Sequence, residues 1–253
     1  MIDVGIDGAV ATVTLDRPAK LNALTPEMVT GLRDALTGLD ANPEVRALIL
    51  TGAGPKAFCV GSDIGELDRY DTAWEFRERP EYCDLVRAVR KPVIAAVNGY
   101  AFGGGLELAL SCDIRLAAAH ATFAAPEIKL GWIGGGGVSS LLTHAVGASN
   151  AALMLYTGDP VDADRALGWG LVSATHPADA LLPAARELAA AIAARPPIAA
   201  RTAKLNIRAA HAMPLENAIA YERDLQTICF ATEDAAEGRA AFAARRAPRF
   251  TGR

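Results

Sequence analysis

Residues 95–108 place the strongest constraint on what this chain can fold into. An apolar run typical of a buried strand leads into three consecutive glycines, and a short apolar helix carrying one carboxylate, Glu107, follows. A helix that begins at those glycines leaves backbone N–H groups free at the positive end of its dipole. We therefore expect a dry site that stabilises negative charge developing on an oxygen atom, with Glu107 beside it.

Length and composition limit the class of protein. The 253 residues suit one large domain or two small ones, and 51% hydrophobic residues are enough for a sizeable core. The net charge of −4, with Lys and Arg spread along the chain, argues against nucleic acid as a partner. The four cysteines lie far apart without a CxxC pair, so we expect reduced thiols and neither a disulfide framework nor a metal site.

Targeting and membrane signals also bear on where the protein works. The first residues carry no basic-then-apolar signal pattern, and alanine-rich runs such as residues 181–194 are interrupted by charge. We therefore expect a cytoplasmic protein without a membrane partner.

Strand and helix patterns alternate along most of the chain, which favours parallel strands joined by crossover helices. Strands are expected at residues 2–6, 10–15, 46–51, 93–97, 114–117, 122–124 and 171–174. Helices are expected at residues 25–39, around residue 64, at residues 72–89, and over most of the chain after residue 147. The C-terminal third, residues 177–249, is helical and amphipathic, and we expect it to pack on a neighbouring subunit or over the chain's own active site.

Several common catalytic motifs are absent from the sequence. It contains no GxxxxGK[ST], no fitting GxGxxG, no HExxH and no GxSxG. These absences argue against a nucleotide-binding P-loop, a dinucleotide-binding fold, a zinc peptidase and an ordinary serine hydrolase.

Two segments supply candidate backbone donors. Gly61 permits a tight turn before a helix start, so the N–H of Ser62 is expected to be free, and Gly104 opens the helix that holds Glu107. A thioester or amide carbonyl between these two N–H groups would be polarised, and an enolate would be stabilised. Glu127 follows a predicted strand, and Pro126 fixes its approach.

Together these segments resemble the crotonase superfamily, the enoyl-CoA hydratase/isomerase group. The match runs in order through residues 15–24, 58–64, 98–108, 126–147 and 233–250. The resemblance implies an α/β fold, a crotonase-like spiral of ββα repeats with a helical C-terminal trimerisation region. It also implies a spiral core with the active site at residues 1–190 and a helical oligomerisation region at residues 191–253, assembled as a homotrimer or a dimer of trimers.

The resemblance further implies an acyl-CoA substrate and assigns roles to particular residues. The N–H groups of Ser62 and Gly104 would form the oxyanion hole, and Glu107 and Glu127 match the acidic pair of the hydratases. The expected reaction is hydration of 2-enoyl-CoA to 3-hydroxyacyl-CoA, with Glu107 as base toward water and Glu127 as acid toward the α-carbon. Coenzyme A enters as part of the substrate, and we expect no metal or redox cofactor.

Substrate contacts are expected from residues flanking these motifs: Lys20, Ala23, Lys56, Gly61, Asp63, Ile64, Gly103 and Trp132. Arg17, Lys20 and Lys56 are candidates for the coenzyme phosphates, and the aromatic residues Tyr70, Trp74 and Phe76 for the border of the acyl tail.

Two departures from the family pattern bear on which reaction is catalysed. Ser62 replaces the usual alanine, and four glycines, residues 134–137, replace a segment that usually includes proline. These departures leave open another crotonase reaction (isomerisation, dehydration or decarboxylation). The oligomerising tail is also compatible with a non-catalytic acyl-CoA-binding protein.

Overall fold

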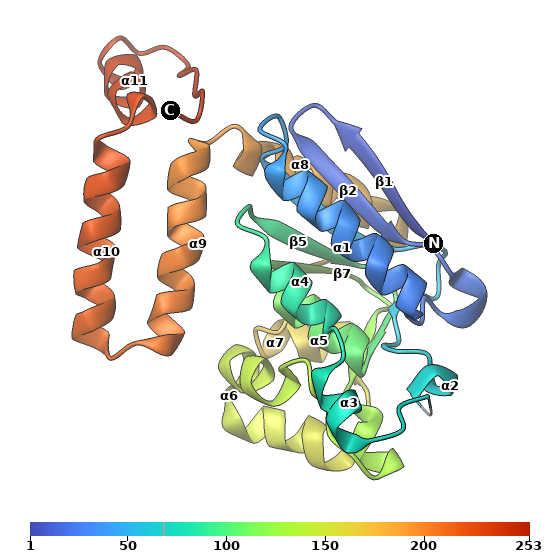
Figure 1. The fold of residues 1–253 in the computed structure, drawn as a ribbon. Helices are drawn as coiled ribbons and strands as arrows, with labels where there is room; N and C mark the ends of the chain where they lie inside the picture. Colours follow the sequence, from blue (N-terminus) through green and yellow to red (C-terminus); the bar gives the residue numbers. More distant parts are fainter. Residues whose placement is uncertain (68) are drawn as a thin grey trace.

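The computed structural model describes residues 1–67 and 69–253, in which two sheets are surrounded by helices and a pair of long helices extends from one side (Figure 1). The larger sheet has the order β1 (Ile2–Asp7), β2 (Val10–Leu15), β3 (Ala47–Gly52), β5 (Val93–Val97), β7 (Ile114–Ala118) and β10 (Ala174–His176). The smaller sheet has the order β4 (Ala57–Cys59), β6 (Tyr100–Phe102), β8 (Thr122–Ala124) and β9 (Val161–Asp162).

The chain advances as a spiral. The strands β3, β5 and β7 lie side by side and parallel in the larger sheet, and the strand that follows each of them, β4, β6 or β8, joins the smaller sheet. A helical segment then returns the chain for the next turn. The expected spiral of ββα repeats is therefore confirmed. Because every turn ends at the same edge, loops far apart in the sequence meet there.

Asparagine side chains hold the corners of the spiral. Asn98, between β5 and β6, donates from its Nδ2 to the carbonyls of Gly52 (2.9 Å) and Gly54 (2.7 Å) at the preceding corner, and its Oδ1 accepts the N–H of Gly52 (3.1 Å). The fully buried Asn22 likewise donates to the carbonyls of Ala53 (3.0 Å) and Ala57 (2.8 Å). These bonds join neighbouring corners of the spiral and satisfy backbone groups there.

Helices cover both faces of the larger sheet. The helix α8 packs across its strands on one face, and α1 and α4 lie on the other (Figure 1). The helices are α1 (Pro26–Ala41), α2 (Ile64–Leu67), α3 (Ala73–Glu78), α4 (Tyr82–Ala88), α5 (Gly104–Ser111), α6 (Val138–Thr157), α7 (Ala163–Gly168), α8 (Ala178–Ala193), α9 (Pro197–Ala212), α10 (Leu215–Phe230) and α11 (Glu233–Ala243). Two 3-10 turns, η1 (Pro18–Lys20) and η2 (Pro126–Leu130), precede α1 and α6.

The N-terminal elements follow their local signals. The strands β1 and β2 pair antiparallel through a two-residue turn, Gly8–Ala9, in which Gly8 has a φ of +55°. The helix α1 begins as predicted, because the Thr25 side chain accepts the N–H of Met28 (3.3 Å) and Pro26 occupies the first helical position.

Three expectations were wrong in detail. The helix predicted for residues 72–89 is two helices, α3 and α4, because Pro80 interrupts the pattern between them. The strand predicted at residues 171–174 lies slightly later in the chain, at β10. Leu171 belongs to the preceding loop, where its side chain is buried and its N–H donates to the carbonyl of Ala166. The strands β4, β6 and β9 were missed, since two or three residues are too few to show a period.

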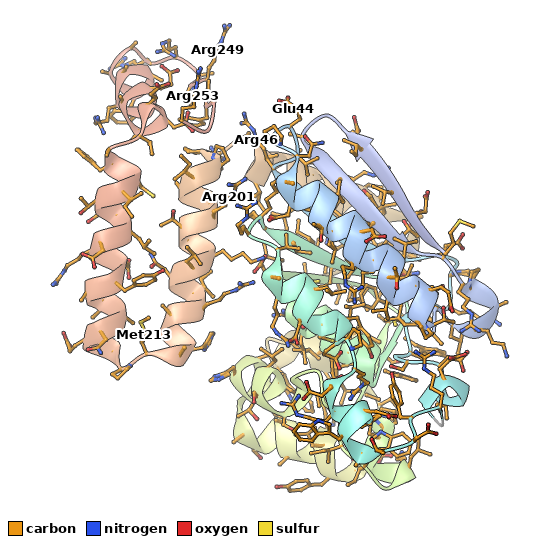
Figure 2. All side chains as sticks on the ribbon, viewed as in Figure 1. Glu44, Arg46, Arg201, Met213, Arg249 and Arg253 are labelled. Carbon is orange, nitrogen blue, oxygen red and sulfur yellow. The ribbon has the colours of Figure 1, made fainter. Side chains whose placement is uncertain are left out.

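The C-terminal helices leave the core and are tied back to it near the chain end. Figure 1 shows α9 and α10 as an antiparallel pair, and Figure 2 places Met213 at the turn between them, far from Arg46 and the C-terminus. The Arg46 guanidinium donates to the carbonyls of Phe250 (2.9 Å) and Ala193 (3.3 Å). The predicted boundary at residue 190 falls inside α8, and the division into two regions stays a prediction.

The helix α6 is long and apolar enough to cross a membrane by length and composition. Its backbone is not helical throughout, however, because Gly147 has a φ of +77° and a ψ of 160°. The break leaves two pieces of about ten residues, each about 15 Å long at 1.5 Å per residue, which is half the thickness of a bilayer core.

Candidate active site

The helix α5 brings Glu107 into the interior of the spiral. Gly103, with a φ of +55°, turns the chain out of β6, and every residue of α5 after Gly104 is buried. A side chain on Gly105 would begin 1.9 Å from the carbonyl oxygen of Cys59, so glycine is required for α5 to pack against the end of β4. Glu107 therefore lies in the first turn of a buried helix, where the helix dipole favours a carboxylate.

The two predicted backbone donors lie next to each other. Gly61 has a φ of +88°, and a Cβ there would lie 2.8 Å from the amide nitrogen of Gly104. Leu24 brackets the turn: its N–H donates to the carbonyl of Gly61 (2.8 Å), and its carbonyl accepts the N–H of Asp63 (2.9 Å). Within the described residues, the N–H groups of Ser62 and Gly104 have no acceptor, and both residues line one cavity.

The four-glycine segment encloses the carboxylate of Glu107. Its Oε1 accepts the N–H groups of Gly136 (2.8 Å) and Val138 (3.2 Å). A Cβ on Gly134 would lie 2.5 Å from this Oε1, and one on Gly136 would lie 2.7 Å from Oε2. Burial raises the pKa of Glu107, the two amide donors oppose that rise, and the charges of Glu81 and Glu127 add to it. Positions 134 and 136 thus require glycine, because the carboxylate of Glu107 occupies the space that a side chain would take.

Glu127 enters the same cavity from η2. Its Oε1 lies 2.9 Å from the position a Cβ would take on Gly103, beside the start of α5. Its Oε2 is buried and has no hydrogen-bond partner among the described residues. Burial raises the pKa of Glu127. The two carboxyl groups therefore differ in surroundings, because backbone amides hold Glu107 and leave Oε2 of Glu127 without a donor.

A cavity of about 620 Å³ contains this constellation. The predicted site residues that line it are Gly61, Ser62, Ile64, Gly103, Gly104, Glu107, Glu127 and Trp132. Of the aromatic residues considered for the acyl tail, Phe76 lines the cavity, Tyr70 packs edge-on against Phe76, and Trp74 is 73% exposed outside it.

The other predicted substrate contacts lie outside this cavity. Lys20 is exposed at the end of η1, and Lys56 lines a separate 230 Å³ cavity beside Leu21. The Arg17 guanidinium bonds the carboxylate of Asp63 (2.8 Å) and the carbonyl of Ala23 (3.1 Å). The bond from Arg17 lowers the pKa of Asp63. Arg17 and Asp63 therefore brace the turn that presents Ser62.

Comparisons with known proteins agree with this geometry. The family model for enoyl-CoA hydratase/isomerase matches residues 5–253. The chain belongs to the enoyl-CoA hydratase/isomerase family. A probable enoyl-CoA hydratase of Mycobacterium bovis is 44% identical to it over 98% of this chain and 96% of that protein. A crotonyl-CoA hydratase of Syntrophomonas wolfei is 38% identical over 95% of this chain and 94% of that protein. A crystal structure of an enoyl-CoA hydratase subunit from Geobacillus kaustophilus matches this chain with a TM-score of 0.94 and 38% identity. The match covers 100% of this chain and 98% of that chain.

Sequence reasoning missed several residues of the cavity wall in this family member. Tyr82 lines the cavity with only 7% of its surface exposed, and the Arg79–Glu81 ion pair (3.3 Å) lies beside it. The amides of Gly136 and Val138 that hold Glu107 were also missed. The four glycines were the available signal for those amides, because glycine lets the backbone approach another group closely, and that group is the carboxylate of Glu107.

Proposed function

We propose that this protein hydrates 2-enoyl-CoA thioesters to 3-hydroxyacyl-CoA. The observation that carries the proposal is one cavity that holds both buried carboxyl groups, Glu107 and Glu127, together with the two free amides of Ser62 and Gly104. The names of the relatives above support the same reaction. Coenzyme A is part of the substrate, and the proposed chemistry needs no metal or redox cofactor, since it moves only water and a proton.

The two amides act on the thioester oxygen. In the proposed complex the N–H groups of Ser62 and Gly104 donate to the carbonyl oxygen, which becomes an enolate oxygen when water adds to the β-carbon. They stabilise the developing charge, because they are fixed by the turn at Gly61 and by the start of α5. Each such donor contributes roughly a hundred- to a thousandfold in rate.

The carboxyl groups divide the proton transfers. The amide donors from Gly136 and Val138 favour the ionised form of Glu107, which suits a base that orients and deprotonates water. The unsatisfied, buried Oε2 of Glu127 favours the protonated form, which suits an acid that supplies the α-proton. Both groups face the same cavity, so the two can share contact with the attacking water.

The remaining parts of the proposal concern the coenzyme and the assembly. Lys20 and Lys56, which are both exposed near η1 and β4, are proposed to bind the coenzyme phosphates. The C-terminal helices are proposed to join three chains, or two such trimers, and the protein is proposed to be cytoplasmic.

A spectrophotometric assay tests the reaction. Wild-type protein mixed with crotonyl-CoA is expected to remove the ultraviolet absorbance of the conjugated enoyl group. Glu107→Gln and Glu127→Gln should each lower kcat about a hundred- to ten-thousandfold, while the exposed Glu222→Gln on α10 leaves it unchanged.

The alternatives give different results in the same assay. An isomerase that relies on one base would survive one of the two substitutions. Acyl-CoA binding without turnover at any chain length, insensitive to either substitution, would instead identify a non-catalytic binding protein.

A further inference from the structure

Tyr82 is a buried polar residue of the cavity that the proposed mechanism leaves without a role. It begins α4, immediately after Glu81, whose carboxylate caps that helix by accepting the N–H of Cys83 (3.4 Å) and pairs with Arg79 (3.3 Å). These contacts fix the segment that carries the ring. Only 7% of Tyr82 is exposed, and the residue lines the cavity that holds the carboxyl groups.

The phenolic oxygen lies between the two residues whose amides face that cavity. A Cβ on Gly104 would lie 1.8 Å from Tyr82 Oη, so the hydroxyl occupies the space directly over Gly104. On the other side, the Ser62 hydroxyl donates to Tyr82 Oη at 3.4 Å. Among the described residues, the proton of the Tyr82 hydroxyl has no acceptor.

The chemistry of this hydroxyl suits donation to a charged oxygen. Burial raises the pKa of Tyr82 well above its usual value, so the protonated phenol is the favoured form. Since the Ser62 hydroxyl donates to the phenolic oxygen, the pair forms a short chain in which Tyr82 is the better donor.

We propose that the Tyr82 hydroxyl is a third hydrogen-bond donor to the thioester oxygen, beside the amides of Ser62 and Gly104, and that the Ser62 hydroxyl positions it. This inference rests on the proposed function, because it requires an acyl-CoA in the cavity. The phenol donates a hydrogen bond and keeps its proton. The proposal also accounts for Ser62, since an alanine there would keep the amide and lose the group that orients Tyr82.

The test combines Tyr82→Phe with two readouts. In steady-state hydration of crotonyl-CoA, kcat is expected to fall about ten- to a hundredfold with little change in KM, because the lost bond strengthens only as charge develops. In the second readout, a 3-ketoacyl-CoA such as acetoacetyl-CoA is bound and its enolate absorbance is followed against pH. The pH at which half of the bound ligand is in its enolate form should rise by about one to two units. This shift corresponds to the same tenfold to hundredfold loss of enolate stabilisation. The exposed Tyr156→Phe is the matched control.

A double-mutant cycle separates donation from packing. Ser62→Ala is expected to reduce kcat less than Tyr82→Phe does, and the double variant should be no slower than Tyr82→Phe alone, because Ser62 acts through Tyr82. Additive losses would overturn the role given to Ser62.

The remaining outcomes also decide the proposal. It is overturned if Tyr82→Phe changes neither kcat nor enolisation, if KM alone rises, or if the wild-type protein binds no 3-ketoacyl-CoA. A wild-type protein that enolises the bound ligand but hydrates no enoyl-CoA would refute the proposed function alone, and the shift in Tyr82→Phe would still decide the role of Tyr82.

Discussion

Single residues of the glycine segment hold the carboxylate of Glu107 in place, and this can be tested by adding one methyl group. A Cβ on Gly134 would lie 2.5 Å from Glu107 Oε1, whereas one on Gly135 would lie 3.4 Å from Arg79 Nη2, an ordinary contact. Gly134→Ala is expected to displace the carboxylate and lower kcat about a hundredfold, since a displacement of about 1 Å is enough for such a loss. Gly135→Ala should retain most activity in the same crotonyl-CoA assay. Equal activity in both variants would show that the segment does not position Glu107.

Glu107 is also expected to make folding stability depend on pH. Burial raises the pKa of Glu107 in the folded protein, so its stabilising contribution is complete below about pH 4.3, the ordinary glutamate pKa, and is lost as pH rises through the raised pKa. Glu107→Gln keeps an uncharged acceptor for the same two amides. Its Tm should therefore exceed that of the wild type at neutral pH, and the difference should shrink as pH falls toward 5.

Calorimetry at a series of pH values measures this difference. The exposed Glu216→Gln should show no such trend. A Glu107→Gln protein that is less stable than the wild type at every pH would mean that the charged form is favoured by the fold.

Whole elements differ in how far the sequence predicts them. The strand, glycines and helix around Glu107 follow from local signals, because the apolar run, the turn and the buried helix lie within residues 95–108. The strands β4 and β6 could not be found that way, since three residues pair only because the spiral brings their corners together at Asn98. Tyr82 was missed for a similar reason. Its closeness to Gly104 depends on how α4 packs on α5, a contact that no local pattern records.

The helix α9 is held to the core by a buried ion pair, which gives a prediction at the scale of the element. Lys204 Nζ donates to the carboxylate of Asp113 (2.7 Å) and to the carbonyl of Lys91 (2.9 Å), and 5% of the Lys204 side chain is exposed. Lys204→Met should reduce the free energy of unfolding by about 3 kcal/mol, because it leaves Asp113 without its counter-charge. Lys129→Met removes an exposed ion pair with Asp159 and should change that free energy by less than about 1 kcal/mol. Urea unfolding measures both, and similar losses would contradict the role of burial.

At the scale of the whole molecule, the extended helix pair needs a partner for its apolar side chains. Leu225 is the one buried residue of α10 in the described structure, while Ile228 is 58% exposed and Leu215 is 72% exposed. A two-helix extension with so little buried surface gains its stability from packing on something else. The proposed assembly of three chains would cover these side chains with a second and a third copy.

Light scattering after size-exclusion chromatography tests the assembly. The wild-type protein should elute at three or six times the mass of one chain. Ile228→Glu places a charge among the apolar contacts and should shift the protein toward monomers, because an unpaired charge is unfavourable in a buried interface. Gln226→Glu, an exposed polar position on the same turn of α10, adds the same charge and should leave the mass unchanged. A wild-type protein that elutes as a monomer would exclude the helix pair as an assembly surface.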